Sequence, residues 1–266
     1  MPLPASLALG RVSLTVTDLD RSVAWYQRAL GLRPMGDGLL GDGEEVLVEL
    51  VEDAQATPPG RTAGLFHYAL LFERAELSRV ALRLARTQTP IQGASDHGTH
   101  EAIYLADPDG NGIELAADRP RSAWPAGLGY AGGPAPLDLD GLMALAAGEA
   151  PADRVRPGLR MGHLHLHVGD IGEGRRFYCD VVGFEEQANL GTAAFVSAGG
   201  YHHHLGFNVW NGVGVGPPPP GSVGLRHWTV VLPPEDAAAL RERAGAGEDG
   251  LVRDPWGTAM RVQDAA

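Results

Sequence analysis

The chain has 266 residues, of which 44% are apolar, so it is long enough for two ordinary domains and can bury a substantial core. Its net charge of -12 argues against nucleic acid and against an anionic membrane surface as partners. The single cysteine, Cys179, leaves no intramolecular disulfide framework and no cysteine-based zinc site. No stretch has the pattern of a signal peptide or a membrane span, so a cytoplasmic protein is expected.

The first predicted elements form a pattern that recurs later in the chain. The stretch GRVSLTVTDLDRSVAWYQRALGL at residues 10–32 aligns without a gap with GHLHLHVGDIGEGRRFYCDVVGF at residues 162–184. Each stretch predicts a strand of alternating apolar residues, a helix that begins after an aspartate (Asp18 or Asp170), and a stop at a glycine. Such internal similarity predicts a repeat architecture.

A second recurring pattern completes the repeat. GLFHYALLF aligns with GLRHWTVVL, and DPDGNGIEL aligns with DPWGTAMRV. Each repeat is predicted as a strand, a helix and two or three further strands joined by glycine-rich turns. The chain therefore divides into four units, A (10–54), B (64–118), C (160–213) and D (224–264).

The segment between units B and C separates two predicted domains. Its first half, DRPRSAWPAGLGYAGGPAP, is rich in proline and glycine and is predicted to be a linker, whereas LDLDGLMALAAG could form one short helix. We therefore expect a first domain over residues 1–118 (units A and B), a linker over 119–158 and a second domain over 159–266 (units C and D). Unit D is shorter than unit B because it lacks a counterpart of SDHGTHEAIYL.

Histidines are concentrated in unit C. Alternate residues of a strand share one face, so in GHLHLHV the histidines lie on one face and the aliphatic residues on the other. In YHHHLGFNV the same parity predicts that His202 and His204 share a face and that His203 opposes them. Packing alone does not readily explain so many histidines on two predicted strands, so we expect a metal site. These histidines are His163, His165, His167, His202, His203 and His204.

One carboxylate in unit B stands where the strand pattern expects an apolar residue. Glu114 lies between Ile113 and Leu115, and a buried carboxylate without a partner is costly. By contrast, His227 at a strand start and Glu49 among other charges have the pattern of packing or rim residues. Two imidazoles and one carboxylate on an octahedral ion leave three positions open, the arrangement typical of Fe(II) oxygenases.

The stretch DHGTHEAIYLADPDGNGIEL resembles the signature of extradiol ring-cleaving dioxygenases, in which the functional positions follow one another in fixed order. The residues at those positions are His97, Ile103, Tyr104, Asp107, Pro108, Gly110 and Glu114. Ser95, two residues before the histidine, departs from the signature. Over nearly its whole length the chain resembles the vicinal oxygen chelate superfamily, which includes glyoxalase I, bleomycin-resistance proteins and extradiol dioxygenases, and within it the bacterial catechol 2,3-dioxygenases.

This resemblance implies an α+β fold in which four βαβββ units form two cup-shaped, mostly antiparallel sheets. It also implies a metal site in one cup, with a base and hydrogen-bonding residues beside it. The implied metal ligands are His67, Glu114 and His163, with His204 or His202 as a candidate fourth, and the implied catalytic residues are His203, His97 and Tyr104.

The pairing of units decides which of these residues share a cup. Arg11 of unit A stands at the position of a ligand histidine, and Arg261 of unit D stands at the position of the glutamate. A guanidinium has no lone pair to give to a metal, so neither A with B nor C with D makes a complete site. We therefore predict a working cup built from units B and C. Arg11 and Arg261 should meet in an A/D cup without metal, near Glu49.

The resemblance implies a metal-dependent extradiol dioxygenase that opens a catechol-type ring with O2, as in the catabolism of aromatic hydrocarbons. Fe(II) is the expected cofactor, with Mn, Ni or Zn as alternatives. The expected partners are a small aromatic diol and O2, without nucleic acid or membrane, and a homodimer is an open alternative. Two other functions compete: a glyoxalase-like isomerase or lyase that uses a metal without O2, and a ligand-sequestering resistance protein that needs no metal.

Overall fold

A computed structural model of the chain describes residues 1–149 and 152–265. Unit A contains β2 (Val12–Val16), α1 (Leu19–Trp25), the π-helical turn η1 (Tyr26–Leu30), β3 (Arg33–Gly36), β4 (Leu39–Gly41) and β5 (Val46–Glu52). Unit B contains β6 (Gly64–Leu71), α2 (Arg74–Arg86), β7 (Gly93–Asp96), β8 (His100–Ala106) and β9 (Gly112–Asp118).

The second half of the chain repeats this order. Unit C contains β11 (Arg160–His167), α4 (Ile171–Arg175), the π-helical turn η4 (Arg176–Val182), β12 (Glu185–Asn189), β13 (Ala193–Ser197) and β14 (Leu205–Asn208). Unit D contains β15 (Gly224–Leu232), α5 (Pro234–Arg243), β16 (Leu251–Arg253) and β17 (Ala259–Asp264). The predicted α+β class is confirmed, except that unit D has one strand fewer than the βαβββ pattern, in the segment where the sequence is shorter.

The first helix of units A and C begins and ends as predicted. Asp18 accepts a hydrogen bond from the backbone N–H of Arg21 at 2.9 Å, and Asp170 accepts one from that of Glu173 at 2.7 Å. Both are N-caps that satisfy a free donor of the first helical turn. The helical segments end at Gly31 and Gly183, whose φ angles of 76° and 99° favour glycine.

A tyrosine shared by units A and C links each unit to the one that follows it. The hydroxyl of Tyr26 donates to Asp107 at 3.1 Å, and that of Tyr178 donates to Asp254 at 2.8 Å. Each aspartate opens the tight turn before the last strand of units B and D. The recurrence of the tyrosine along the chain therefore reflects a buried bond from unit A to B and from unit C to D.

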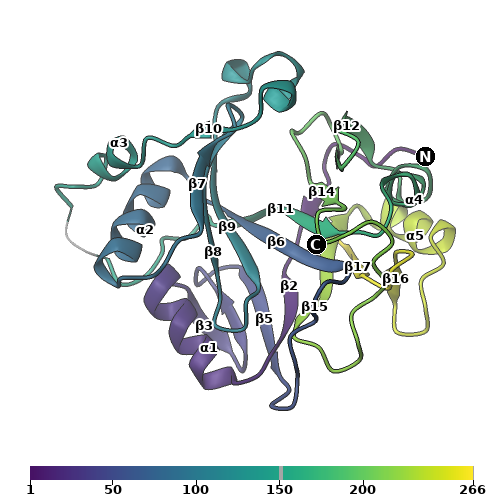
Figure 1. Ribbon diagram of the computed structural model, residues 1–266, viewed down its shortest axis with the longest axis horizontal. Helices are drawn as coiled ribbons and strands as arrows, with labels where there is room; N and C mark the ends of the chain where they lie inside the picture. Colours follow the sequence, from purple (N-terminus) through teal and green to yellow (C-terminus); the bar gives the residue numbers. More distant parts are fainter. Residues whose placement is uncertain (150–151, 266) are drawn as a thin grey trace.

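The strands form two curved sheets, each assembled from a unit of the first half and a unit of the second. One sheet has the order β7–β8–β9–β6–β11–β14–β13–β12, and the other has the order β3–β4–β5–β2–β15–β17–β16. Each unit contributes one parallel pair, and the other pairings are antiparallel. The short β1 (Ala8–Leu9) pairs with both β11 and β15 and joins the two sheets. Figure 1 shows β6 and β11 side by side at the centre of the molecule.

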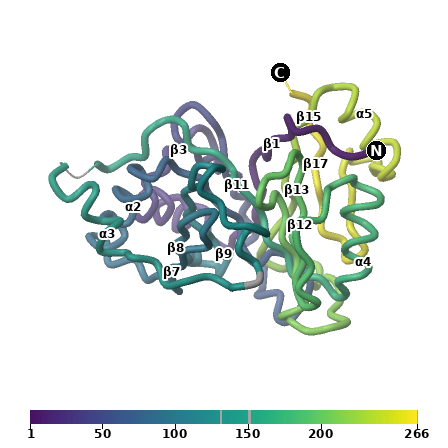
Figure 2. Tube along the Cα trace, turned by 90° about the horizontal axis from the view of Figure 1, so that it is seen from above, coloured from purple at the N-terminus to yellow at the C-terminus, as the bar shows by residue number. Residues whose placement is uncertain are grey.

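The helices divide differently from the sheets. In Figure 1, α1 and α2 lie together on one side of the molecule, and α4 and α5 lie on the other. Figure 2 shows the same separation from above, with most of the first half of the chain on one side and the second half on the other, while the N-terminal segment with β1 lies beside β15 of the second half. Each sheet therefore crosses from one half of the chain to the other. The domain limits at residues 118 and 159 remain a prediction.

The segment between units B and C contains several short elements. These are η2 (Arg121–Ala123), η3 (Ala126–Gly132), β10 (Ala135–Pro136) and α3 (Leu139–Ala144). The short helix predicted within LDLDGLMALAAG is thus confirmed as α3. β10 pairs with β7, which holds the segment against unit B. Within the described residues, no helix is long and apolar enough to cross a membrane.

Candidate active site

Units B and C meet along β6 and β11, and this edge carries the central histidines. The two strands are antiparallel, with His67 and His165 as Cα partners. β9 runs parallel to β6 on its other side and places Glu114 opposite Ala69. Paired residues share a face of the sheet, and Ala69 shares a face with His67, two residues before it on β6. Glu114 and His67 therefore point into the same cup. The structure thus assembles units B with C and A with D, which is the pairing that the two arginines favour.

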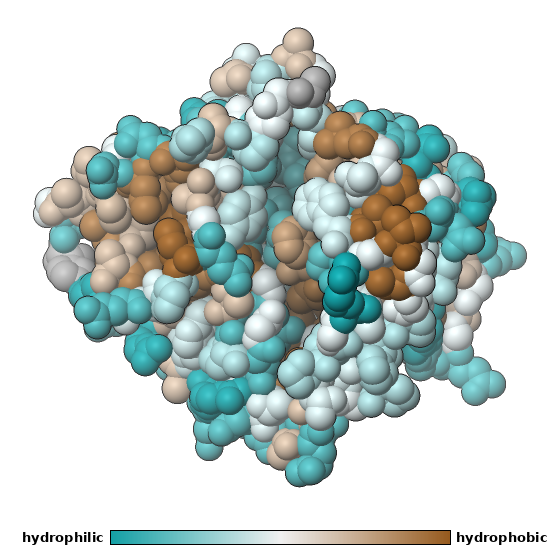
Figure 3. Space-filling view, viewed as in Figure 1, coloured by the Kyte–Doolittle hydropathy of each residue, from teal (hydrophilic) through white to brown (hydrophobic). Residues whose placement is uncertain are grey.

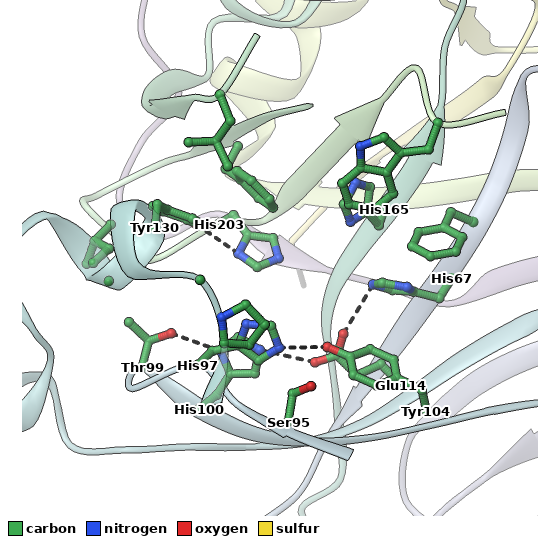
Figure 4. Close-up of a pocket in the computed structure, with 18 residues that line it drawn as sticks. His67, Ser95, His97, Thr99, His100, Tyr104, Glu114, Tyr130, His165 and His203 are labelled. Carbon is green, nitrogen blue, oxygen red and sulfur yellow. Dashed lines mark hydrogen bonds and ion pairs between the residues drawn. The ribbon is translucent and has the colours of Figure 1, made fainter. Parts of the chain in front are cut away.

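Three of the predicted metal ligands converge in this cup. The Nε2 atoms of His67 and His163 lie 3.1 Å and 3.0 Å from Oε2 of Glu114. All three side chains are buried, and their ligand atoms lie within 4.8 Å of one another. Figure 4 shows His67 and Glu114 facing each other across the floor of a pocket. One His and one Glu come from unit B, and the second His comes from unit C.

His100, which the sequence analysis did not select, lies beside the same carboxylate. Its Nε2 is 3.1 Å from Oε1 of Glu114, and its Nδ1 is 2.9 Å from the Thr99 hydroxyl. Apart from this contact with His100, Oε1 has no hydrogen-bond partner within the described residues, although it is buried. Strand parity could have identified His100, since it lies an even number of residues from Tyr104 on β8 and therefore shares a face with it.

The electrostatics of this cluster suit a divalent cation. Burial alone raises the pKa of Glu114, but the imidazoles of His163, His100 and His67 hold that pKa well below its usual range. Burial also lowers the pKa of His163, which keeps its imidazole neutral and able to donate a lone pair. An ionised carboxylate with an unpaired buried oxygen, next to imidazole nitrogens, is a donor set that fits a divalent metal ion.

His97 and Tyr104 lie at one side of the cluster, as a pair. The Tyr104 hydroxyl is 2.7 Å from Nε2 of His97, and Tyr104 is the Cα partner of Glu114 between β8 and β9. The His97 ring stacks on that of His100, with ring centres 4.4 Å apart. Burial lowers the pKa of His97 to about 4 and raises that of Tyr104, so His97 is neutral and Tyr104 is protonated at neutral pH.

His203 approaches the cluster from unit C. Its ring centre lies 4.2 Å from that of His163, and its Nδ1 is 3.2 Å from the Tyr130 hydroxyl, as Figure 4 shows. The side chain is buried, and burial lowers its pKa well below the ordinary value, so the ring is neutral. The structure therefore brings His203 into the same cup as His67, His163 and Glu114.

The predicted parity of the three consecutive histidines is wrong. His202 does not share a face with His204, because the strand begins only at Leu205 and the preceding residues bend. His202 and His203 both face the cup, with Nδ1 atoms 2.9 Å apart. His204 instead accepts a hydrogen bond from the backbone N–H of Ala198 at 3.1 Å.

The two candidate fourth ligands are therefore not equivalent. His202 is 3.1 Å from Asp118 and belongs to two other groups that could hold an ion, one with His163 and His203 and one with His100 and Asp118. His204 belongs to none of the groups found among the described residues. Neither histidine is brought to Glu114.

A cavity of about 390 Å³ lies over the cluster, a size typical of small-molecule sites. Its polar floor includes Glu114, Tyr104 and four of the histidines, and its opposite wall is largely aromatic. The wall and rim residues are Phe66, His165, Leu190, Phe195 and Trp210 from units B and C, with Leu128, Gly129, Tyr130, Gly133 and Pro134 from the interunit segment. Figure 3 shows the molecule hollowed between its two halves on this face.

The A/D cup has a different chemistry. Arg11 lies 3.7 Å from Glu49, and Arg261 donates to Nε2 of His227 at 3.3 Å. Burial and then the charge of Arg261 lower the pKa of His227 to about 4. In the described part of this cup, no three side chains form a group able to hold a metal ion.

The buried histidines predict that the metal-free protein loses stability in acid. Burial lowers the pKa values of His202, His97 and His204 to about 3, 4 and 4, from the ordinary 6.5. Below pH 6.5 the unfolded chain binds protons at these histidines that the folded chain does not bind, so the free energy of unfolding falls as the pH falls. Each such histidine contributes a slope of up to about 1.4 kcal/mol per pH unit.

Urea unfolding of the metal-free protein between pH 7.5 and 4.5 measures this effect. We expect a plateau above pH 6.5 and a steep decline below it. His204→Phe should make the decline shallower, because it removes one of these groups. A free energy of unfolding that stays level down to pH 4.5 would contradict the burial of neutral histidines.

Comparisons with known proteins identify the family of the chain. The model of the Glyoxalase/Bleomycin resistance protein/Dioxygenase superfamily matches residues 8–115 and 160–265. The chain therefore belongs to this superfamily. It is an extradiol dioxygenase-like member, since it is 40% identical over 248 residues to the Catechol-2,3-dioxygenase of Bacillus subtilis (strain 168), which covers 87% of this chain and 85% of that protein.

Solved structures share the fold at much lower identity. A Bacillus subtilis strain 168 protein with a provisional dioxygenase designation superposes with a TM-score of 0.63 at 12% identity, covering 99% of this chain and 86% of that one. Glyoxalase I from Zea mays superposes with a TM-score of 0.56 at 16% identity, covering 97% of this chain and 92% of that one. These similarities support the fold and do not identify the reaction.

Proposed function

We propose that the protein is an extradiol ring-cleaving dioxygenase that acts on a catechol-type aromatic with O2 and uses Fe(II). The observation that carries this proposal is the buried Glu114 between His67 and His163, at the floor of a cavity with an aromatic wall. The 40% identity to a catechol-2,3-dioxygenase over most of both chains supports the same reaction. His67, His163 and Glu114 would hold the metal.

The donor set suits Fe(II). Fe(II) held by His67, His163 and Glu114 would supply a redox-active Lewis acid for the reaction of a catechol with O2. The carboxylate and the neutral His163 need no proton change to bind it.

The cavity wall suits a flat apolar ring. Phe66 and Trp210 meet edge to face, with ring centres 5.7 Å apart, and Phe195 lies 5.6 Å from His165. Trp210 is 53% exposed, so its ring stands at the entrance. Aromatic side chains bind a ring by offset or edge contacts, while the polar groups on the opposite floor orient it.

The chain also supplies groups for proton movement. His203 is neutral and buried beside His163, so it can accept the proton of a catechol hydroxyl. Tyr104 stays protonated and can donate a hydrogen bond to substrate oxygen, with His97 2.7 Å away to orient it. Acid–base help of this kind typically contributes about 10²–10⁴-fold in rate.

Oxygen uptake tests the proposal. Protein loaded with Fe(II) should consume O2 when catechol is added and should turn the solution yellow as a hydroxymuconic semialdehyde forms. Tyr104→Phe should slow this turnover while retaining iron, because Tyr104 is not a ligand. If a panel of catechols and hydroquinones gives no O2 uptake with iron demonstrably bound, a glyoxalase-like isomerase becomes the better explanation.

A further inference from the structure

A chain of close contacts runs from Asp118, near the surface, to His203 in the cavity. Asp118 ends β9, and its Oδ1 lies 3.1 Å from Nε2 of His202. Nδ1 of His202 lies 2.9 Å from Nδ1 of His203, and the latter atom is 3.2 Å from the Tyr130 hydroxyl. The Asp118 side chain is 25% exposed, whereas His202 is 1% exposed and His203 is 5% exposed.

These contacts are compatible with one arrangement of protons. Asp118 is a carboxylate that accepts a hydrogen bond from the Tyr201 hydroxyl at 2.8 Å, and its other oxygen faces the buried imidazole of His202. A carboxylate only accepts, so His202 carries its proton on Nε2 and has a lone pair on Nδ1. His203 must then donate from its own Nδ1, since two facing lone pairs do not bond.

Tyr130 agrees with this assignment. Its hydroxyl lies 2.7 Å from the backbone carbonyl oxygen of His202, which can only accept, so the single hydroxyl proton points there. The Tyr130 oxygen is therefore free to accept from Nδ1–H of His203 at 3.2 Å. Asp118 and Tyr130 approach from opposite ends of the network and favour the same tautomer of His203.

We propose that Asp118 is a positioning residue that acts through His202 to hold His203 in its Nδ1–H tautomer, with the Nε2 lone pair free for the substrate. The effect of Asp118 on catalysis rests on the function proposed above, but the tautomer of His203 does not. Figure 4 shows Tyr130 on one side of the His203 ring, with the ring's second nitrogen on the side toward Glu114. The nitrogen that remains unprotonated thus faces the reaction site.

The consequence for proton transfer is direct. The hydroxyl O–H bond of the substrate breaks, its electron pair stays on oxygen, and the proton forms a new bond to Nε2 of His203. The resulting imidazolium keeps its Nδ1–H bond to His202, and the Asp118 carboxylate stabilises the positive charge through that imidazole. The Ser-His-Asp triad uses a carboxylate in the same way, to set a tautomer and to stabilise an imidazolium.

Tyr201 makes the assignment testable, because it orients the carboxylate. Its hydroxyl donates to Oδ2 of Asp118 at 2.8 Å. In Asp118→Asn, the amide oxygen should remain as the acceptor of that bond, which turns the amide NH2 toward Nε2 of His202. His202 would then carry its proton on Nδ1 and donate to Nδ1 of His203, which moves the His203 proton to Nε2. Asp118→Asn should therefore reverse the tautomers of both His202 and His203.

The experiment is long-range ¹H–¹⁵N NMR of the imidazoles in the full chain loaded with Zn(II), with His203 assigned by the loss of its signals in His203→Gln. We expect the Nδ1–H form of His203 in the unaltered protein and in Tyr201→Phe, where the carboxylate is kept. We expect the Nε2–H form in Asp118→Asn. Finding His203 as Nε2–H in the unaltered protein, or unchanged in Asp118→Asn, would overturn the proposal.

Turnover supplies an independent second measurement. In Fe(II)-loaded protein, Asp118→Asn should lower kcat by about 10²–10⁴-fold, the range for loss of a general base, and should leave iron content unchanged. The NMR readout needs no turnover, so the two proposals fail separately. If the tautomers invert as expected and the iron-loaded protein consumes no O2, the assignment of His203 stands and only the dioxygenase proposal falls.

Discussion

Replacing Glu114 with alanine should abolish the retention of a divalent metal at neutral pH. Glu114 is the one carboxylate within 4.8 Å of both His67 and His163 among the groups found in the described residues. Loss of a hydrogen-bond partner of a ligand already costs about 10–100-fold in metal affinity, so loss of the ligand should cost more. The measurement is metal content by mass spectrometry after dialysis of protein loaded with Fe(II) or Zn(II).

Two matched variants sharpen this result. Glu114→Gln keeps the side-chain shape and removes the charge, so it should also lose the metal without opening a cavity. Glu49→Ala removes the corresponding carboxylate of unit A, which lies beside Arg11 in the A/D cup, and should leave metal content unchanged. Full metal occupancy in both Glu114 variants would show that the metal is bound at another site.

Much of the fold follows from local sequence patterns that occur in both halves of the chain. The aspartate caps of α1 and α4 and the glycines that end η1 and η4 depend on residues close in sequence, and both occur where predicted. The B/C pairing could be inferred as well, because Arg11 and Arg261 are incompatible with ligand positions. That inference depended on chemistry rather than on strand propensity, and β6 does pair with β11.

The rest of the site depends on features that local patterns do not encode. His202 and His203 lie before β14, where alternation no longer applies, so strand parity misplaced them. Register shifts in the β6–β11 pair also decide how unit C meets unit B. Tyr130 reaches the cavity from a segment that its glycine content marked only as a linker, through residues with positive φ such as Gly129.

Replacing His203 with glutamine should lower kcat of the Fe(II)-loaded protein by about 10²–10⁴-fold without loss of iron. His203 lies beside His163 and lines the cavity, but its side chain is not grouped with Glu114. The amide of glutamine fills similar space and is not basic, so the catechol proton would have no acceptor. Iron content and O2 uptake, measured on the same preparation, separate a catalytic defect from a binding defect.

An anaerobic measurement isolates the proton step itself. When 4-nitrocatechol is added to the Fe(II)-loaded protein without O2, its absorption spectrum reports how far it is deprotonated. The unaltered protein should produce the more deprotonated form, and His203→Gln should bind the same compound with less deprotonation. His204→Gln is the matched control, since His204 bonds to Ala198 outside the cluster and should give the unaltered spectrum. If His203→Gln deprotonates the compound as fully as the unaltered protein does, another group is the base, and His97 is the next candidate because it is neutral and lines the same cavity.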